Sequence, residues 1–154
     1  SETVTTPAQD KIVEIGTKER PGYVEFSGQV GSGVLSFPVP NYSYITTKFG
    51  QGGHRGTDIC APAGTPIYAA ADGVVSTNAH WSYGICVKIS HSPSLVTIYG
   101  HMSARAEGIT DGVFVTQGQL IGYVGSTGNS TGNHLHFEVY YNNVRVDPDP
   151  YLGI

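Results

Sequence analysis

A strict alternation of two kinds of side chain runs through residues 132–141, Gly-Asn-His-Leu-His-Phe-Glu-Val-Tyr-Tyr. In an extended chain, one side would carry Leu135, Phe137, Val139 and Tyr141, and the other His134, His136, Glu138 and Tyr140. This period of two predicts a half-buried strand with two histidines on its polar face. Side chains two residues apart on a strand lie about 6.5–7 Å apart. One imidazole would therefore be able to bind a metal ion while the other reaches a bound substrate.

Many other segments carry strand patterns between turns rich in glycine and proline. The chain has 21 Gly, 9 Pro and 10 Tyr but only 13% charged residues, a composition that favours short strands over helices. We therefore expect an all-β fold of antiparallel sheets that form a groove. The expected strands are 45–49, 58–60, 67–70, 73–77, 85–90, 95–99, 113–115, 119–124, 132–141 and 144–146. Residues 103–112 are expected to hold at most one helical turn, and 147–150 to end the fold.

Length and charge limit the classes of function. A chain of 154 residues can bury one sizeable core, and it contains no run of 18 apolar residues that would predict a transmembrane helix. The net charge is −4, without a run of Lys or Arg, which argues against nucleic acid or an anionic membrane surface as partner. Residues 1–33 become rich in glycine and small polar residues, so we expect the end of a preceding module and a linker there, with the functional domain at 34–154.

Histidines supply the candidate chemistry. Four of the six lie at strand edges or on a polar strand face next to glycine-rich turns: His54, His101, His134 and His136. Catalytic zinc sites use three ligands from His, Asp and Glu and leave a fourth position for water, so His54, Asp58 and one strand histidine would suffice. Zinc lowers the pKa of its bound water to about 7. A neighbouring histidine, whose ordinary pKa is about 6.5, is suited to accept the proton of that water. His80 and His91 are expected to be ordinary solvated or hydrogen-bonded residues.

Three other residues keep two interpretations open. Cys60 and Cys86 are both expected on the polar side of their strands, and the sequence leaves a disulfide and two free thiols equally possible. Cys60 is a weak candidate metal ligand. Glu138 is either an outer partner of His136 or an ordinary cross-strand polar residue.

One motif match does not indicate a catalytic serine. Residues 128–132 match the G-x-S-x-G pattern of serine hydrolases, but they lead into a strand rather than a helix. Ser130 is therefore expected to be a turn residue.

Several ordered motifs together resemble a known family. They are His54-Arg55-Gly56-Thr57-Asp58, Gly64-Thr65-Pro66-Ile67-Tyr68-Ala69, Tyr99-Gly100-His101-Met102 and the stretch from Gly125 to Glu138. Residues 34–150 resemble lysostaphin/LytM-type zinc metallo-endopeptidases. The resemblance implies a groove with zinc bound by His54, Asp58 and His136, and catalytic roles for His101 and His134. It also implies a peptidoglycan peptide substrate, and a location in the cell wall or envelope outside the cytoplasmic membrane.

The mechanism that combines the two lines of reasoning has zinc-bound water attack a peptide carbonyl. His134 would act as general base, and His101 would stabilise the oxyanion or help to protonate the leaving amine. We expect a monomer, and the cleaved bond is left open. The loop between Phe49 and His54 is shorter than in the family, which predicts a lower groove wall, and Asn133 stands where proline is common. Residues 4–18 resemble the tail of a G-five module.

Two alternatives belong to other classes of protein. A non-catalytic wall-binding or regulatory domain of the same fold would lack some ligands or catalytic histidines, whereas all five positions are filled here. A structural zinc protein would close the fourth position with a protein ligand. The sequence therefore favours the enzyme.

Overall fold

A computed structural model describes residues 35–154. The expected module end and linker at 1–33, including the stretch that resembles a G-five module, lie outside the described residues. The strands are β2 (Tyr44–Thr47), β3 (Thr57–Cys60), β4 (Pro66–Tyr68), β5 (Gly73–Ser76), β6 (Ile85–Ser90), β7 (Leu95–Arg105), β8 (Phe114–Val115), β9 (Leu120–Val124), β10 (His134–Tyr141) and β11 (Val144–Val146). Two 3-10 turns, η1 (Gln51–Gly53) and η2 (Trp81–Tyr83), and one short helix, α1 (Pro148–Leu152), complete the elements. The all-β expectation is confirmed.

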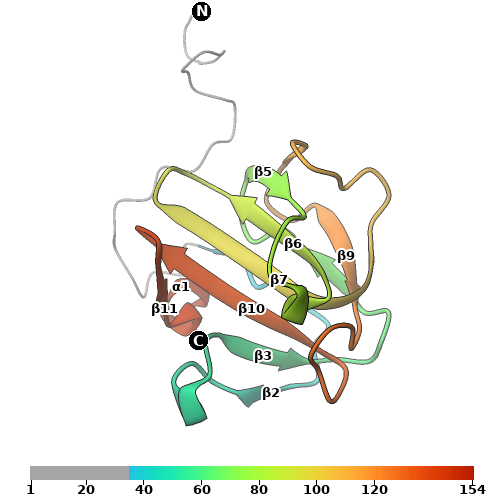
Figure 1. Ribbon diagram of the computed structural model, residues 1–154, viewed down its shortest axis with the longest axis vertical. Coiled ribbons are helices and arrows are strands. Elements are labelled where there is room, and N and C mark those ends of the chain that lie inside the picture. Colours follow the sequence, from blue (N-terminus) through green and yellow to red (C-terminus); the bar gives the residue numbers. More distant parts are fainter. Residues whose placement is uncertain (1–34) are drawn as a thin grey trace, which may run out of the picture.

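One sheet organises the described residues, with the strand order β2-β3-β10-β7-β6-β5-β8. Strand β11 pairs with β10, and β9 pairs with both β7 and β4. The strand pairings of this sheet are antiparallel. Figure 1 shows β10 between β3 and β7, so the strand with the two histidines has a hydrogen-bonded neighbour on each side.

The predicted alternation of β10 decides which face of the sheet is core. Leu135, Phe137 and Val139 are fully buried, together with Ile59 of β3 and Tyr99 of β7. Burial of such side chains stabilises a fold by about 1.5–3 kcal/mol each. The opposite face of β10 is left to carry the histidines.

Strand β7 continues beyond the expected end at residue 99 and changes partner on the way. Its first part pairs with β10 up to Gly100, and its second part pairs with β9 from Met102 onward. Against β6, the register passes from Val87–Tyr99 to Ile85–Met102, so β7 holds one extra residue there. The extra residue is a β-bulge at His101, whose φ is +64°. The prediction that the strand ends before His101 was wrong.

The ends of two other elements differ in detail from what the sequence predicts. Residues 103–105 continue β7, and 106–112 form turns without a helical turn. Residues 147–150 start a helix rather than only ending the fold, because the Asp147 side chain accepts a hydrogen bond from the Asp149 amide (3.1 Å) and Pro148 occupies the first helical turn. Asp149 is buried and accepts hydrogen bonds from Thr57 (2.8 Å) and Lys48 (2.6 Å), which hold α1 to the β2–β3 edge.

The two cysteines are free thiols. Cys60 lies on β3 and Cys86 on β6, three strand steps apart in the sheet order. Neighbouring strands are about 4.8 Å apart, so the separation exceeds the Cα–Cα limit of about 7 Å for a disulfide. Cys86 is buried against Tyr83 and Ile98 rather than exposed on a polar surface. Among the described residues, no helix is long and apolar enough to cross a membrane.

Candidate metal and catalytic site

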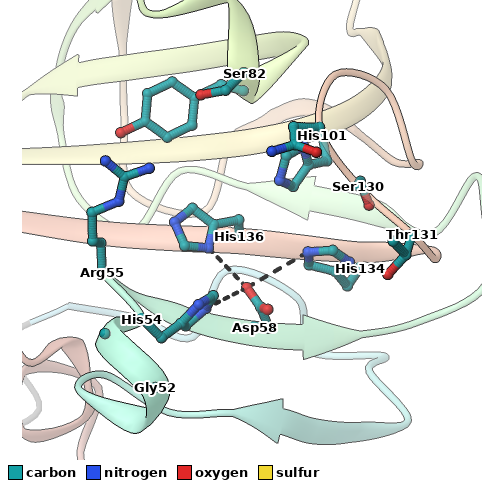
Figure 2. A pocket seen from close by; sticks show the side chains of 13 residues that line it. Gly52, His54, Arg55, Asp58, Ser82, His101, Ser130, Thr131, His134 and His136 are labelled. Atoms are coloured by element: carbon teal, nitrogen blue, oxygen red, sulfur yellow. Dashed lines mark hydrogen bonds and ion pairs between the residues drawn. The ribbon is translucent and has the colours of Figure 1, made fainter.

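Asp58 lies at the centre of a cluster of imidazoles. Strands β3 and β10 pair so that Asp58 stands opposite His136, and Cys60 opposite His134. The Asp58 Oδ1 atom lies 2.8 Å from His136 Nδ1, 3.0 Å from His54 Nε2 and 3.6 Å from His134 Nε2 (Figure 2). His54 comes from the turn after η1, so the cluster joins a loop to two neighbouring strands.

The residues present fit a divalent metal ion. One ligand atom each from His54, Asp58 and His136 lies within 4.8 Å of the other two. His54 Nε2 is buried and has no hydrogen bond, since its 3.0 Å approach to Asp58 Oδ1 lacks suitable hydrogen-bond geometry. A buried nitrogen without a partner is costly unless a ligand occupies it. Two imidazoles and one carboxylate are the donors of a zinc site that keeps one position open.

The electrostatics of the cluster already favour a cation. Burial alone would lower the pKa of His136, but hydrogen bonds to Asp58 and Glu138 raise it to about 9. Burial would likewise raise the pKa of Asp58, yet the hydrogen bond from His136 and the charge of His134 hold it below its ordinary value. The metal-free chain therefore holds a proton on His136 between two carboxylates. A metal ion bound at Nδ1 would take the place of that proton.

Glu138 fixes the other side of His136. It is fully buried, and its Oε2 lies 2.8 Å from His136 Nε2. Its Oε1 accepts hydrogen bonds from the Tyr83 hydroxyl (2.8 Å) and from Arg145 Nε (3.1 Å). Burial would raise the pKa of Glu138, but the bonds from His136 and Tyr83 hold it below its ordinary value. Of the two interpretations of Glu138, the outer partner of His136 is the one observed.

His101 and His134 form a second pair beside the cluster, with ring centroids 5.0 Å apart. The Nδ1 of His101 lies 2.7 Å from the Thr127 carbonyl oxygen, and that of His134 lies 3.0 Å from the Gly132 carbonyl oxygen. A carbonyl only accepts, so each Nδ1 carries the hydrogen and each neutral ring keeps an unprotonated Nε2. Burial lowers the pKa of His101, which outweighs the opposite effect of the Thr127 carbonyl.

The bulge in β7 explains how His101 reaches this face. Tyr99 faces the core and Gly100 stands opposite His136, so strict alternation would turn residue 101 back into the core. The extra residue lets His101 share the face of His136, with ring centroids 5.9 Å apart, while Met102 returns to the core. A bulge that redirects one side chain is a common device beside active sites.

A cleft of about 390 Å³ contains all five predicted site residues. Ser82 and Tyr83 from η2, Arg55, and the turn residues Asn129, Ser130 and Thr131 line it as well. A second hollow of about 540 Å³ continues it past β2, and the two share Asp58, Thr131 and His134. The cluster therefore lies midway along an extended groove that suits a chain-like substrate.

The other candidates lie outside the cluster. Cys60 lines the second hollow, but its thiol lies 3.5 Å from the Thr46 hydroxyl and it is not among the residues that could share an ion. Ser130 is a turn residue on the cleft wall, as expected. His91 is fully buried and hydrogen-bonded, and His80 is exposed and caps η2.

Comparisons with known proteins give a consistent result. The family model described as Peptidase family M23 matches residues 52–148. The DD-carboxypeptidase/endopeptidase Mpg of Neisseria meningitidis is 46% identical over 98 residues, which cover 62% of this chain and 22% of that protein. The chain spans about a fifth of the length of such curated relatives.

Solved structures resemble the fold closely. A zinc-containing peptidase from Vibrio cholerae is 35% identical with a TM-score of 0.65, and the match covers 74% of this chain and 39% of that one. The catalytic domain of the antimicrobial peptidase lysostaphin from Staphylococcus simulans is 31% identical with a TM-score of 0.64, and the match covers 75% of this chain and 96% of that one.

Proposed function

Because this chain belongs to peptidase family M23, we propose that it is a zinc-dependent endopeptidase that hydrolyses peptide bonds in the stem or cross-bridge of bacterial peptidoglycan. The observation that carries the proposal is the convergence of His54, Asp58 and His136 within 4.8 Å, beside two further imidazoles in one cleft. The family membership agrees with the resemblance found in the sequence. The envelope is the location that fits a peptidoglycan substrate.

In this proposal, His54 Nε2, Asp58 Oδ1 and His136 Nδ1 hold the ion. Zinc, when bound, would polarise the substrate carbonyl and lower the pKa of a water molecule. Glu138 keeps the hydrogen on His136 Nε2, which leaves Nδ1 free to act as a ligand.

His134 is the proposed general base. Its Nδ1–H is held by the Gly132 carbonyl, so its Nε2 is available to accept a proton from the attacking water. His101 would help once it carries a second proton, when its Nε2 donates to the oxyanion or the leaving amine. Because burial lowers its pKa, His101 gives up such a proton readily.

The test uses purified sacculi and counts new amino termini. We expect release that a chelator abolishes and added zinc restores, and that His134→Ala lowers about 10²- to 10⁴-fold, the usual range for loss of a general base. Lys88→Gln, on β6 and outside the cleft, is the control and should behave as the native chain. Mass spectrometry of the fragments names the cleaved bond.

Two outcomes would contradict the proposal. Release that survives both the chelator and His134→Ala would rule out this mechanism. Intact sacculi with tight zinc binding would favour the non-catalytic wall-binding or regulatory domain instead.

A further inference from the structure

Arg55 lines the cleft directly beside the proposed metal ligands and is exposed. Within residues 35–154, the ion pairs of lysine and arginine side chains join Lys48 to Asp149 and Arg145 to Glu138, and none joins Arg55. It makes no hydrogen bond in the same part of the chain. Figure 2 shows its side chain reaching from the β3 side of the cleft toward the side that carries Ser82.

The acidic side chain that lines the cleft and the buried carboxylate behind it already have other partners. Asp58 faces three imidazoles, and Glu138 is enclosed by His136, Tyr83 and Arg145. Apart from the histidines, the remaining lining residues are uncharged. Arg55 is therefore the permanent cation of this cleft, in a chain whose net charge of −4 would otherwise repel anions.

The backbone that carries Arg55 is fixed. His54 precedes it, and a Cβ on the following residue, Gly56, would run into the Phe137 carbonyl oxygen of β10. Arg55 thus lies between the proposed ligand His54 and Gly56, whose backbone packs closely against β10. The fixed backbone keeps the guanidinium within reach of a substrate in the cleft.

We propose that Arg55 binds a carboxylate of the substrate, so that this cleft selects peptides carrying a free carboxylate near the scissile bond. The inference rests on the proposed peptidase function and adds the substrate class. A guanidinium matches a carboxylate with two parallel hydrogen bonds, a geometry that an ammonium group cannot reproduce. The attachment orients the peptide chain across His101 and His134 without taking part in the chemistry.

The test compares peptidoglycan stem-peptide dimers that differ only in one carboxylate at a time, free or amidated. For the native chain, amidation at one position should lower kcat/KM about 10- to 100-fold, the usual effect of losing a hydrogen-bonded charge. Arg55→Gln should cause a similar loss on the free acid and almost none on that amide. Arg55→Lys keeps the positive charge but cannot form the two parallel hydrogen bonds. Its kcat/KM on the free acid should therefore lie between those of the native chain and Arg55→Gln.

Lys88→Gln is the matched control because it removes one positive charge outside the cleft. It should leave the ratio of kcat/KM for the free acid to kcat/KM for the amide unchanged. The inference is overturned if Arg55→Gln lowers kcat/KM by the same factor for every substrate, or if it lowers kcat/KM for none of them. If the native chain cleaves no peptide in the panel and releases nothing from sacculi, the proposed function itself fails, which is a separate result.

Discussion

Glu138 shows how much one buried side chain can decide at the residue scale. A fully buried carboxylate is costly unless each oxygen is paired, and here one oxygen faces His136 while the other accepts from Tyr83 and Arg145. The tyrosine ring also lies over the imidazole, with centroids 6.1 Å apart and planes inclined by 28°. The arrangement fixes both the plane of the His136 ring and the nitrogen that carries its hydrogen.

Replacement of Glu138 by Gln tests this residue directly. The amide turns one acceptor into a donor, which must face either His136 Nε2–H or the donors on Tyr83 and Arg145. We expect zinc affinity to fall about 10- to 100-fold, as for other outer partners of metal-binding histidines. Competition with a chromogenic chelator measures the dissociation constant.

Tyr83→Phe is the companion variant, because it removes one hydrogen bond but keeps the carboxylate. Its loss of affinity should be smaller, and near-ultraviolet circular dichroism checks that both variants are folded. Equal zinc affinity in the native chain and Glu138→Gln would refute the positioning role.

The proximity of the five candidate site residues could be predicted from the sequence, whereas the residues that support them could not. The alternation in β10 and the spacing of His54 and Asp58 mark side chains that share a face, and the structure brings them together. Tyr83 and Arg145 were missed, because Tyr83 belongs to an irregular turn and Arg145 to a strand across a hairpin. Their contact with Glu138 depends on tertiary packing, which no local pattern encodes.

At the scale of elements, regular strands were predictable and irregular positions were not. Alternation located the core strands, and the Asn142-Asn143 turn into β11 has the two positive φ values that a tight hairpin needs. The bulge at His101 was missed because it breaks the period of two on which the prediction relied. Helix α1 was missed because its five residues are too few for a helical period.

The contact between β3 and β10 gives an element-scale prediction. Gly56→Ala places a methyl group against the Phe137 carbonyl oxygen and close to the Glu138 side chain. We expect a loss of about 1–3 kcal/mol in the free energy of unfolding, the usual cost of overpacking. Zinc affinity should also weaken, because the clash separates Asp58 from His136. Urea unfolding and chelator competition measure the two effects.

Gly132→Ala is the matched control for that substitution. Gly132 lies in the turn before β10, and an added Cβ would meet nothing within 4 Å. Its unfolding free energy should stay within about 0.5 kcal/mol of the native value. If both variants unfold alike, the close approach at Gly56 is not a constraint on the fold.

At the scale of the whole molecule, the histidines of the cleft and His91 occupy opposite environments. The four histidines of the cleft face one hollow of the surface, whereas His91, which follows β6, is fully buried. Its Nδ1 lies 2.7 Å from the Asp72 carbonyl oxygen and its Nε2 lies 2.8 Å from the Thr97 hydroxyl, which is 2.8 Å from the Tyr99 hydroxyl. The Tyr99 hydroxyl in turn accepts from the Ala70 amide (3.0 Å).

This chain of hydrogen bonds suits a neutral His91. The Asp72 carbonyl can only accept, so Nδ1 carries the hydrogen of a neutral His91, and its unprotonated Nε2 faces the Thr97 hydroxyl. A second proton would place a charge on a side chain that is fully buried. Burial lowers the pKa of His91 to about 4, despite the opposite effect of the Asp72 carbonyl.

The free energy of unfolding of the metal-free chain should therefore fall as the pH falls from about 6.5, the ordinary pKa of histidine, to about 4, the pKa of buried His91. The unfolded chain takes up a proton near pH 6.5, whereas the folded chain resists until about pH 4. The stabilising contribution of neutral His91 is complete above pH 6.5 and is lost toward pH 4. Its size is on the order of 3 kcal/mol, because each pKa unit corresponds to about 1.4 kcal/mol.

His91→Gln isolates that contribution, since the Gln amide can still donate to the Asp72 carbonyl and face the Thr97 hydroxyl but does not titrate in this range. The lowered pKa of His101 changes stability with pH in the same direction, and the raised pKa of His136 does so only above pH 6.5. Both histidines are present in the native chain and in the variant, so their effects cancel when the two unfolding free energies are compared. Urea unfolding from pH 4 to 7 in the presence of a chelator should give a shallower slope for the variant, even if it is less stable throughout. Parallel curves would show that the proton is taken up elsewhere.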